Sequence, residues 1–429
     1  MGKKTKIILG ILAIFMIVGN IGYGESLTEE KEEIYMDKID NNAESDGDIN
    51  MSGEIGVKVE NGKEEIIKGN NITIIGNNGN GVHTISQPKE SPSTIIIEGK
   101  GKVTITGQGA GVNIAKSEGK ISGDDIEITG QKIGGKPHDG VQGSKGSEIT
   151  IAGKKTVKIT GADNGVYLSN KSSGTISGKN IDIIGNAYNG IGIFDSDITI
   201  TGDENVSIRG NDYGVNLQEG STGNISGKNI DITGINGIFL SESSSITIDG
   251  KERTYIDGEE VGVWIQEDGE IIIKSSEVII QGKTDTGIFA AEGGSVKIDS
   301  KNSFIFGEEY SLQAIYGEIT LSENGSHEIY GNIESYGDAS IKIGGKGNKI
   351  SSSSNNEPLK VTAEDGGEID ISLVDGILTG IVDDGRAADA NANGGTINLN
   401  LDNGTWKTHV KSTKKIIVIG GGLSGLMAT

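Results

Sequence analysis

Apolar and polar residues alternate strictly along most of the chain. The segments NIDIIG (residues 180–185), DITITG (197–202) and NVSIRG (205–210) each place an aliphatic residue at every second position. This is the period of a β-strand with one buried face. Gly, Asn, Asp and Ser interrupt the pattern every five to eight residues, which is typical of turns. Residues 51–410 hold no 3.6-residue apolar period long enough for a helix, so the pattern predicts an all-β protein.

The alternation belongs to an internal repeat. The segment ISGKNIDI occurs at residues 176–183 and again at 225–232, 49 residues later. A glycine followed by Val or Ile returns at intervals of 23 to 30 residues, at Gly81, Gly111, Gly140, Gly165, Gly190, Gly214, Gly237, Gly262 and Gly287. The repeating unit is therefore one coil of about 25 residues, with three short strands and three turns.

Three strands and three turns per coil predict a right-handed parallel β-helix of about fourteen coils over residues 51–409. Stacked coils pair each strand with its equivalents about 4.8 Å above and below, and the inward positions become columns of Ile, Val and Leu. The acidic residues 25–50 are expected to form a leader or a cap. In the second case Ser26 and Glu29 would open a short helix.

The N-terminus, MGKKTKIILGILAIFMIVGNIGYGES, has the features of a secretory signal peptide. Lys3, Lys4 and Lys6 precede a twelve-residue apolar segment, and small residues precede a cleavage site before Glu25. Residues 1–24 are thus predicted to direct export to the periplasm, the cell surface or the medium. A retained N-terminal anchor is the alternative.

Charge and cysteine content restrict the possible partners and compartments. The chain has a formal net charge of −23, and residues 1–24 contain three Lys and no acid, so the mature protein carries −23 − 3 = −26. Such a surface repels phosphate backbones, which disfavours nucleic-acid binding. Without cysteine an exported protein forms no disulfides, so packing and backbone hydrogen bonds must stabilise it.

The ISGKNIDI turns, the Gly-Val repeat and TINLNLDNGTWKT (residues 396–408) together resemble the passenger domains of Gram-negative autotransporters. The resemblance implies a surface-exposed β-helix with an adhesin-like role and a host protein or glycan as partner. Autotransporters end in a translocator barrel, and no such pattern follows residue 409 here. We therefore expect a passenger-like protein without its translocator, from an incomplete or rearranged gene.

The last sixteen residues, KKIIVIGGGLSGLMAT, resemble the N-terminus of FAD-dependent oxidoreductases of the succinate dehydrogenase/fumarate reductase flavoprotein type. In that family Gly420, Gly422 and Gly425 would face the cofactor's pyrophosphate. The fingerprint needs a βαβ unit of about 30 residues and an acidic residue about 20 positions on. Only four residues follow Gly425, so we expect residues 410–429 not to bind FAD, and no cofactor is predicted. An FAD-dependent oxidoreductase fragment is an alternative reading of the chain.

A second alternative is a β-helical polysaccharide-active enzyme, which would place acidic and basic side chains in a groove along one face. His138-Asp139-Gly140 is one candidate, but it occupies the position where the repeat has Asp163-Asn164-Gly165. We interpret it as a turn variant and assign no catalytic residue. The sequence lacks both the calcium-binding nonapeptide and the EF-hand loop, so no metal site is predicted.

Aromatic residues recur at one position of the repeat. The second residue after the repeat glycine points outward, and Tyr167, Phe239, Trp264 and Phe289 occupy it, the last three on consecutive coils. They predict an exposed aromatic ladder, which is typical of contact surfaces for sugars or proteins. Alternatively, the rings stack on each other or lie under a loop. The predicted function is that of a secreted or cell-surface passenger with a structural or adhesive role and no catalysis.

Overall fold

The computed structural model describes residues 33–36, 43–87, 90–353, 358–383, 394–407 and 416–420, with only the backbone for the first and last ranges. The chain divides into two units, residues 1–32 and 33–429, and all described residues belong to the second. The predicted signal peptide and the helix expected near Ser26 and Glu29 lie outside the described residues.

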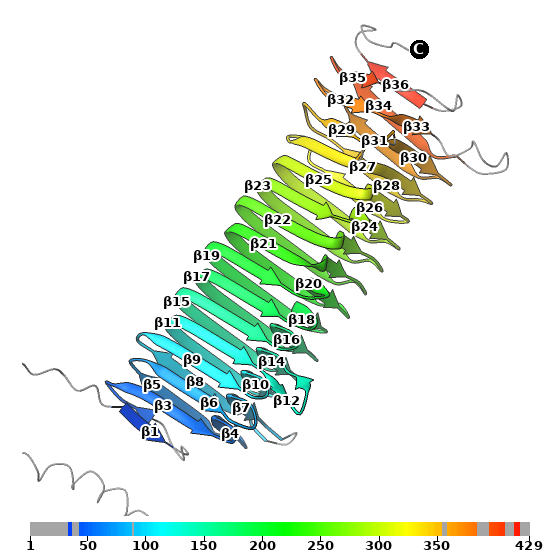
Figure 1. Ribbon diagram of the computed structural model, residues 1–429. Coiled ribbons are helices and arrows are strands. Elements are labelled where there is room, and N and C mark those ends of the chain that lie inside the picture. The colour runs from blue at the N-terminus through cyan, green and yellow to red at the C-terminus, as the bar shows by residue number, and fades with distance from the viewer. Residues whose placement is uncertain are drawn as a thin grey trace, which may run out of the picture. The chain divides into compact units, whose positions relative to one another are not determined.

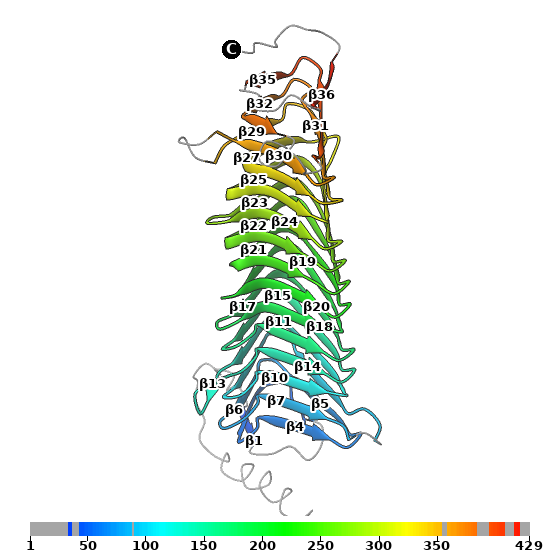
Figure 2. The same cartoon turned by 90° about the vertical axis from the view of Figure 1, so that its right-hand side faces the viewer.

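The described residues form a right-handed parallel β-helix of about fourteen coils with a spacing of about 25 residues, which confirms the predicted fold. Figures 1 and 2 show the strands of successive coils stacked side by side. Each coil contributes one strand to each of three faces, which we name A, B and C in chain order. In one coil, β15 (Glu148–Gly161) crosses face A and face B, and β16 (Val166–Ser169) lies on face C.

The strands fall into four groups. Face A alone contains β2 (Ala43–Glu44), β5 (Glu64–Gly69), β8 (Thr94–Gly99), β26 (Glu318–Leu321), β28 (Ser340–Ile343), β31 (Glu368–Ser372), β34 (Thr396–Leu401) and β36 (Ile416–Gly420). Face B alone contains β1 (Glu33–Met36), β3 (Asp48–Gly53), β6 (Ile72–Gly76), β9 (Lys102–Gly107), β29 (Lys349–Ser351), β32 (Ile377–Thr379) and β35 (Thr405–Lys407). Face C alone contains β4 (Val57–Glu60), β7 (Val82–Ile85), β10 (Val112–Ala115), β14 (Val141–Ser144), β16, β18 (Asn189–Phe194), β20 (Tyr213–Gln218), β24 (Thr286–Ala291), β30 (Lys360–Glu364) and β33 (Ile381–Asp383). Strands that turn a corner are β11 (Glu118–Gly130), β15, β17 (Ser173–Gly185), β19 (Asp197–Arg209), β21 (Thr222–Leu240), β22 (Ser245–Ile265), β23 (Glu270–Gly282), β25 (Ser295–Ile315) and β27 (Ser326–Tyr336).

The core is the continuous aliphatic column that the alternation predicts. Each strand of the coil at residues 148–169 turns two side chains inward, and all six are at most 2% exposed: Ile149, Ile151, Val157, Ile159, Val166 and Leu168. Parallel register places Ile151 between Ile121 and Ile176 of the neighbouring coils. One coil alone would leave these side chains in water, so the hydrophobic effect drives the stacking.

The glycine before each Val or Ile marks a close approach at the corner between faces B and C. A Cβ at Gly140 would lie 2.7 Å from the Gly165 carbonyl oxygen and 2.7 Å from Ile159 Cγ2. At Gly161, on the other side of the corner, a Cβ would overlap the Asn164 carbonyl oxygen. The sequence period is thus partly a steric requirement of this turn. A short antiparallel hairpin, β12 (Lys132–Ile133) and β13 (Lys136–Pro137), extends one coil at the same corner.

The corner between faces C and A is stabilised by a buried serine ladder. The Ser172 N–H donates to Ser196 Oγ (3.0 Å), and the Ser221 N–H donates to Ser244 Oγ (3.1 Å). Ser172 Oγ in turn donates to the Ser169 carbonyl at 2.7 Å. Later coils place a glycine at the same position, as at Gly269, whose N–H bonds the Gln266 carbonyl of its own turn (3.0 Å).

Parallel pairing extends beyond residues 51–409 at both ends. β1 pairs with β3, so strands occur within the segment expected to be a leader or cap. At the other end, the backbone of residues 416–420 forms the strand β36, which pairs in parallel with β34 on face A of the solenoid. Gly420 lies at its end, opposite Leu401, whereas Gly422 and Gly425 lie outside the described residues.

Candidate functional site: an aromatic strip on face C

The outward position on face C forms a single column along the solenoid. Phe239, Trp264 and Phe289 pair with each other on consecutive coils. Tyr167 belongs to the same column, but Gly192 and Asn216 separate it from Phe239. The structure therefore brings three of the four predicted residues together and leaves Tyr167 apart, where its ring packs on Phe194 at a centroid distance of 5.5 Å.

A fourth ring, which sequence reasoning missed, joins the three. Tyr213 packs on Phe239 with ring centroids 5.4 Å apart. Phe239 meets Trp264 at 5.2 Å in an edge-to-face contact, and Trp264 meets Phe289 at 6.0 Å. We call Tyr213, Phe239, Trp264 and Phe289 the aromatic strip. The sequence could have indicated Tyr213, because in Asp212-Tyr213-Gly214 a tyrosine precedes the repeat glycine, where the repeat usually has Asn or Asp.

The strip is less exposed than the sequence predicts. Phe239 is only 8% exposed because the rings on either side cover it, whereas Tyr213, Trp264 and Phe289 are half-buried. Stacking between neighbours, the alternative considered above, thus accounts for Phe239. The other three rings retain accessible surface held in fixed positions, which suits a contact with a partner.

Two rows of acidic side chains border the strip. The first, the C–A row, lies three residues after the outward position, at the corner where the backbone is left-handed; it contains Glu219, Glu242, Glu267 and Glu292. The second, the B–C row, lies at the corner between faces B and C, two residues before the repeat glycine or, in the last coil, before Ser311 in its place. It contains Asp212, Glu260, Asp285 and Glu309. Every member of the C–A row is exposed.

The tyrosines near the strip respond to this negative field. Burial raises the pKa of Tyr213, and the charges of Asp212 and Glu260 raise it further. Burial likewise raises the pKa of Tyr310, followed by the charges of Glu334 and Glu309. In both cases an added phenolate charge would lie close to carboxylates, so the face disfavours anions.

His138 and Asp139 lie at the B–C corner, where Asp139 ends a buried ladder of polar side chains. Asn164 donates both its backbone N–H (3.2 Å) and its Nδ2 (2.8 Å) to Asp139 Oδ1, and Asn189 bonds Asn164 in the same way. Burial raises the pKa of Asp139 to about 6, partly offset by the bonds from Asn164. The carboxylate therefore has a structural role in the turn, as its place in the repeat indicates.

A Ser–His–Asn constellation lies inside the solenoid, in a column that most of the preceding coils fill with Val or Ile. Ser303 Oγ is 2.7 Å from His327 Nδ1, His327 Nε2 is 3.0 Å from the Ser322 carbonyl, and the His327 N–H donates to Asn348 Oδ1 (2.9 Å). His327 is fully buried, and burial lowers its pKa, so the neutral ring is favoured. No substrate reaches this site without opening the core, so the network is a packing feature.

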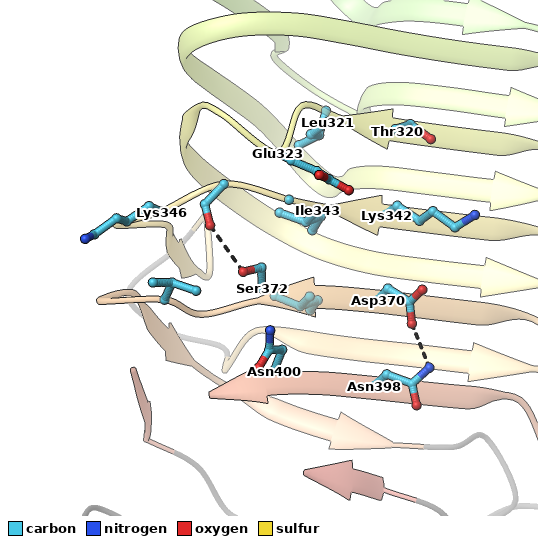
Figure 3. A pocket seen from close by; sticks show the side chains of 14 residues that line it. Thr320, Leu321, Glu323, Lys342, Ile343, Lys346, Asp370, Ser372, Asn398 and Asn400 are labelled. Atoms are coloured by element: carbon cyan, nitrogen blue, oxygen red, sulfur yellow. Dashed lines mark hydrogen bonds between the residues drawn. The ribbon is translucent and has the colours of Figure 1, made fainter. Parts of the chain in front are cut away.

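Face A carries a groove over the coils at residues 318–401, with a cavity volume of about 590 Å³. Figure 3 shows the outward column that forms its floor, Thr320, Lys342, Asp370 and Asn398, beside the turn that carries Lys346. Asn398 Nδ2 donates to Asp370 (2.6 Å), and Ser372 Oγ donates to the Gly345 carbonyl (3.2 Å). Sequence reasoning missed the groove because its walls come from turns of irregular length.

Comparison with known proteins bears on the fold. Residues 139–305, which include the aromatic strip, match the family model described as "Right handed beta helix region". Searches of curated proteins and of solved structures gave no match. Over the residues that the structure describes, there is no helix long and apolar enough to span a bilayer. Within the same ranges, no three His, Cys, Asp or Glu side chains are grouped so as to hold a metal ion.

Proposed function

We propose that this protein is an exported β-helical binding protein with an adhesive role, which holds a partner against the aromatic strip of face C. The observation that carries the proposal is the stack of Tyr213, Phe239, Trp264 and Phe289 on consecutive coils. Aromatic side chains placed on a rigid scaffold lose little conformational entropy on binding and dominate many interfaces. The resemblance to autotransporter passengers supports the same role.

Export rests on the pattern of residues 1–24. If the protein is exported, its mature form in a Gram-negative host should begin at Glu25. N-terminal sequencing of the periplasmic, surface and culture-medium fractions measures this directly. An uncleaved N-terminus in the membrane fraction would instead support the retained anchor.

The adhesive role is tested with beads coated with the purified protein and allowed to attach to cultured cell monolayers under flow. Because a buried aromatic anchor typically contributes about 2 kcal/mol or more, Trp264→Ala should reduce attachment strength by about 30-fold. The matched control is Phe304→Ala, which removes an outward ring from face B that packs on Tyr330 at 5.3 Å. Equal loss in both variants, or in neither, would contradict a role for the strip.

A polysaccharide-active enzyme is the second candidate, and the groove on face A favours it, since it presents Lys342 and Asp370 side by side on its floor. Incubation with acidic and neutral polysaccharides, followed by a reducing-sugar assay, tests this. Product release that Asp370→Asn abolishes would support the enzyme. A yellow absorbance near 450 nm of the purified chain would instead support a flavoprotein.

A further inference from the structure

We propose, on the basis of the function proposed above, that the partner of face C is a cationic polypeptide segment rich in Arg and Lys, which lies along the aromatic strip between the two acidic rows. The strip offers ring faces and edges, and both of its borders offer carboxylates. An extended peptide that carries guanidinium and ammonium groups matches both kinds of surface.

The carboxylates of the C–A row are free to bind such groups. Glu219, Glu242, Glu267 and Glu292 recur at one position of consecutive coils, so they follow each other at about the 4.8 Å spacing of stacked strands. None of them forms an ion pair or a side-chain hydrogen bond with another described residue. Like charges at this spacing repel each other, and a bound cation relieves that repulsion.

The basic residues of the same coils lie elsewhere. Between residues 186 and 340, all of which the structure describes, the only Lys or Arg next to face C is Lys283. It bonds Asp257 of face B at 2.7 Å and so is already paired. Every other Lys and Arg in this range lies on face A, on face B or at the corner between them. Over these coils, face C therefore carries acidic, aromatic and neutral polar side chains but no unpaired basic one, and its charge complements a cationic partner.

The protein already uses the same chemistry within itself, on face B. Arg253 lies over the ring of Tyr255, 5.8 Å from its centroid, and its Nη2 bonds Asp231 at 2.9 Å. One guanidinium there satisfies both an aromatic ring and a carboxylate. Face C repeats the ring and the carboxylate on the consecutive coils of the aromatic strip, where the described residues 186–340 place no unpaired Lys or Arg, so a cation from a partner would complete the same arrangement.

The dimensions give the size of the segment. From the coil of Tyr213 to the coil of Phe289 there are three intervals of about 4.8 Å, or about 14 Å. An extended chain rises about 3.3 Å per residue, so about five residues cover the strip. Arg or Lys at alternate positions of such a segment would point toward the rows and the rings on one side.

The experiment measures fluorescence anisotropy of labelled nine-residue peptides with the full chain. The probe alternates Lys or Arg with Gly, and its two twins carry Glu or Ser in place of the basic residues. Only the cationic probe should bind at 50 mM NaCl, with affinity falling steeply at 300 mM NaCl as the charges are screened. Because exposed charge pairs each contribute a factor of a few, Glu242→Gln/Glu267→Gln/Glu292→Gln should weaken binding about tenfold. Trp264→Ala should weaken binding of the probe about threefold, less than it weakens attachment, because a nine-residue peptide loses the cation–π contact alone and not the larger contact of a whole partner.

The matched control separates this site from general attraction to an acidic protein. Asp249→Asn/Glu277→Gln/Asp299→Asn removes the same charge from the same coils at the A–B corner, opposite face C, and should change the affinity less than about twofold. Equal loss in the two triple variants overturns the cationic site. Attachment in the bead assay that depends on Trp264 but not on the C–A row overturns the cationic partner and leaves the adhesive function standing. Attachment that depends on neither Trp264 nor the C–A row overturns both the cationic partner and the adhesive function of the strip.

Discussion

At the A–B corner, charged side chains of successive coils alternate in sign and pair. Lys179 bonds Glu204 at 3.2 Å, and Lys228 bonds Glu252 at 3.2 Å. At the C–A corner, successive coils place glutamates above one another without a partner among the described residues. The two corners have the same spacing between coils, so geometry does not explain the difference.

The difference in side-chain pairing follows from what stabilises each corner. Buried hydrogen bonds, such as those of the serine ladder, stabilise the C–A corner. The exposed glutamate side chains of the C–A row therefore contribute little to the stability of the fold. Because these glutamate side chains are not needed for stability, they are available for an interaction. The A–B corner has instead a partly exposed asparagine ladder, in which Asn205 Nδ2 donates to Asn180 Oδ1 (2.7 Å) and Asn229 Nδ2 donates to Asn205 Oδ1 (3.1 Å). Its exposed charged side chains pair with each other beside that ladder.

The largest effect concerns the B–C corner, where the Asp139 carboxyl group is buried. The pKa of Asp139 is raised from 3.8 to about 6, chiefly by burial and to a smaller extent by Asp163. The folded state therefore holds its proton more tightly than the unfolded state. Protonated Asp139 therefore contributes to the free energy of unfolding in full below about pH 4, and this contribution is lost as the pH rises through 6.

Asp139→Asn removes this penalty and keeps an acceptor for Asn164. At pH 7.5 the variant should be more stable than the wild type by as much as about 3 kcal/mol, and the two should converge near pH 4. Urea denaturation at both pH values measures the difference. A variant that is less stable at pH 7.5 would show that the carboxylate charge itself is needed.

The next effect concerns the serine ladder. Ser172→Ala removes the acceptor of the Ser147 N–H (3.3 Å) and the donor to the Ser169 carbonyl (2.7 Å), in a turn that water does not reach. Groups left unpaired in such a place cost about 1–3 kcal/mol. Urea denaturation should show a loss of this size for Ser172→Ala and almost none for Ser173→Ala, its half-buried neighbour. Equal losses would mean that the C–A corner does not depend on the ladder.

The fold could be predicted from the sequence because its signals are local and repeated. Alternation fixes which side chains of a coil face inward, and the glycine before Val166 or Ile191 marks the B–C corner in each coil. The register also places Gly192 and Asn216 between Tyr167 and Phe239, so the isolation of Tyr167 was readable from the spacing.

The site was only partly predictable because it depends on contacts between coils. The burial of Phe239 follows from how the rings of Tyr213 and Trp264 turn toward it, which no spacing reveals. The groove on face A depends on turns, such as that of Lys346, whose lengths depart from the repeat. His327 can occupy a core position because Ser303 and Asn348 in adjacent coils form hydrogen bonds with it. No single repeat contains all three residues, so the sequence of one repeat does not reveal the network.

A smaller effect concerns the strip itself. Phe239 and Trp264 meet edge to face, and such a pair contributes about 0.5–1.5 kcal/mol beyond its buried area. A double-mutant cycle with Phe239→Leu and Trp264→Leu, followed by urea denaturation, should yield a coupling of this size. The same cycle on Trp264 and Tyr167, which Gly192 and Asn216 separate, serves as the control and should yield none. Similar coupling in both cycles would show that the strip is not a discrete unit.

The smallest effect tests the two corners against each other directly. Lys228→Gln breaks the pair with Glu252, which is partly exposed, and should lower stability by about 0.2–1 kcal/mol. Glu242→Gln relieves repulsion from the glutamates of adjacent coils and should raise stability by a similar amount, so the two changes have opposite signs. Thermal denaturation at 20 and 500 mM NaCl measures both, and salt should reduce each difference because it screens exposed charges. If Glu242→Gln destabilised the protein, the C–A row would be part of what maintains the fold, and its availability for a cationic partner would lose its physical basis.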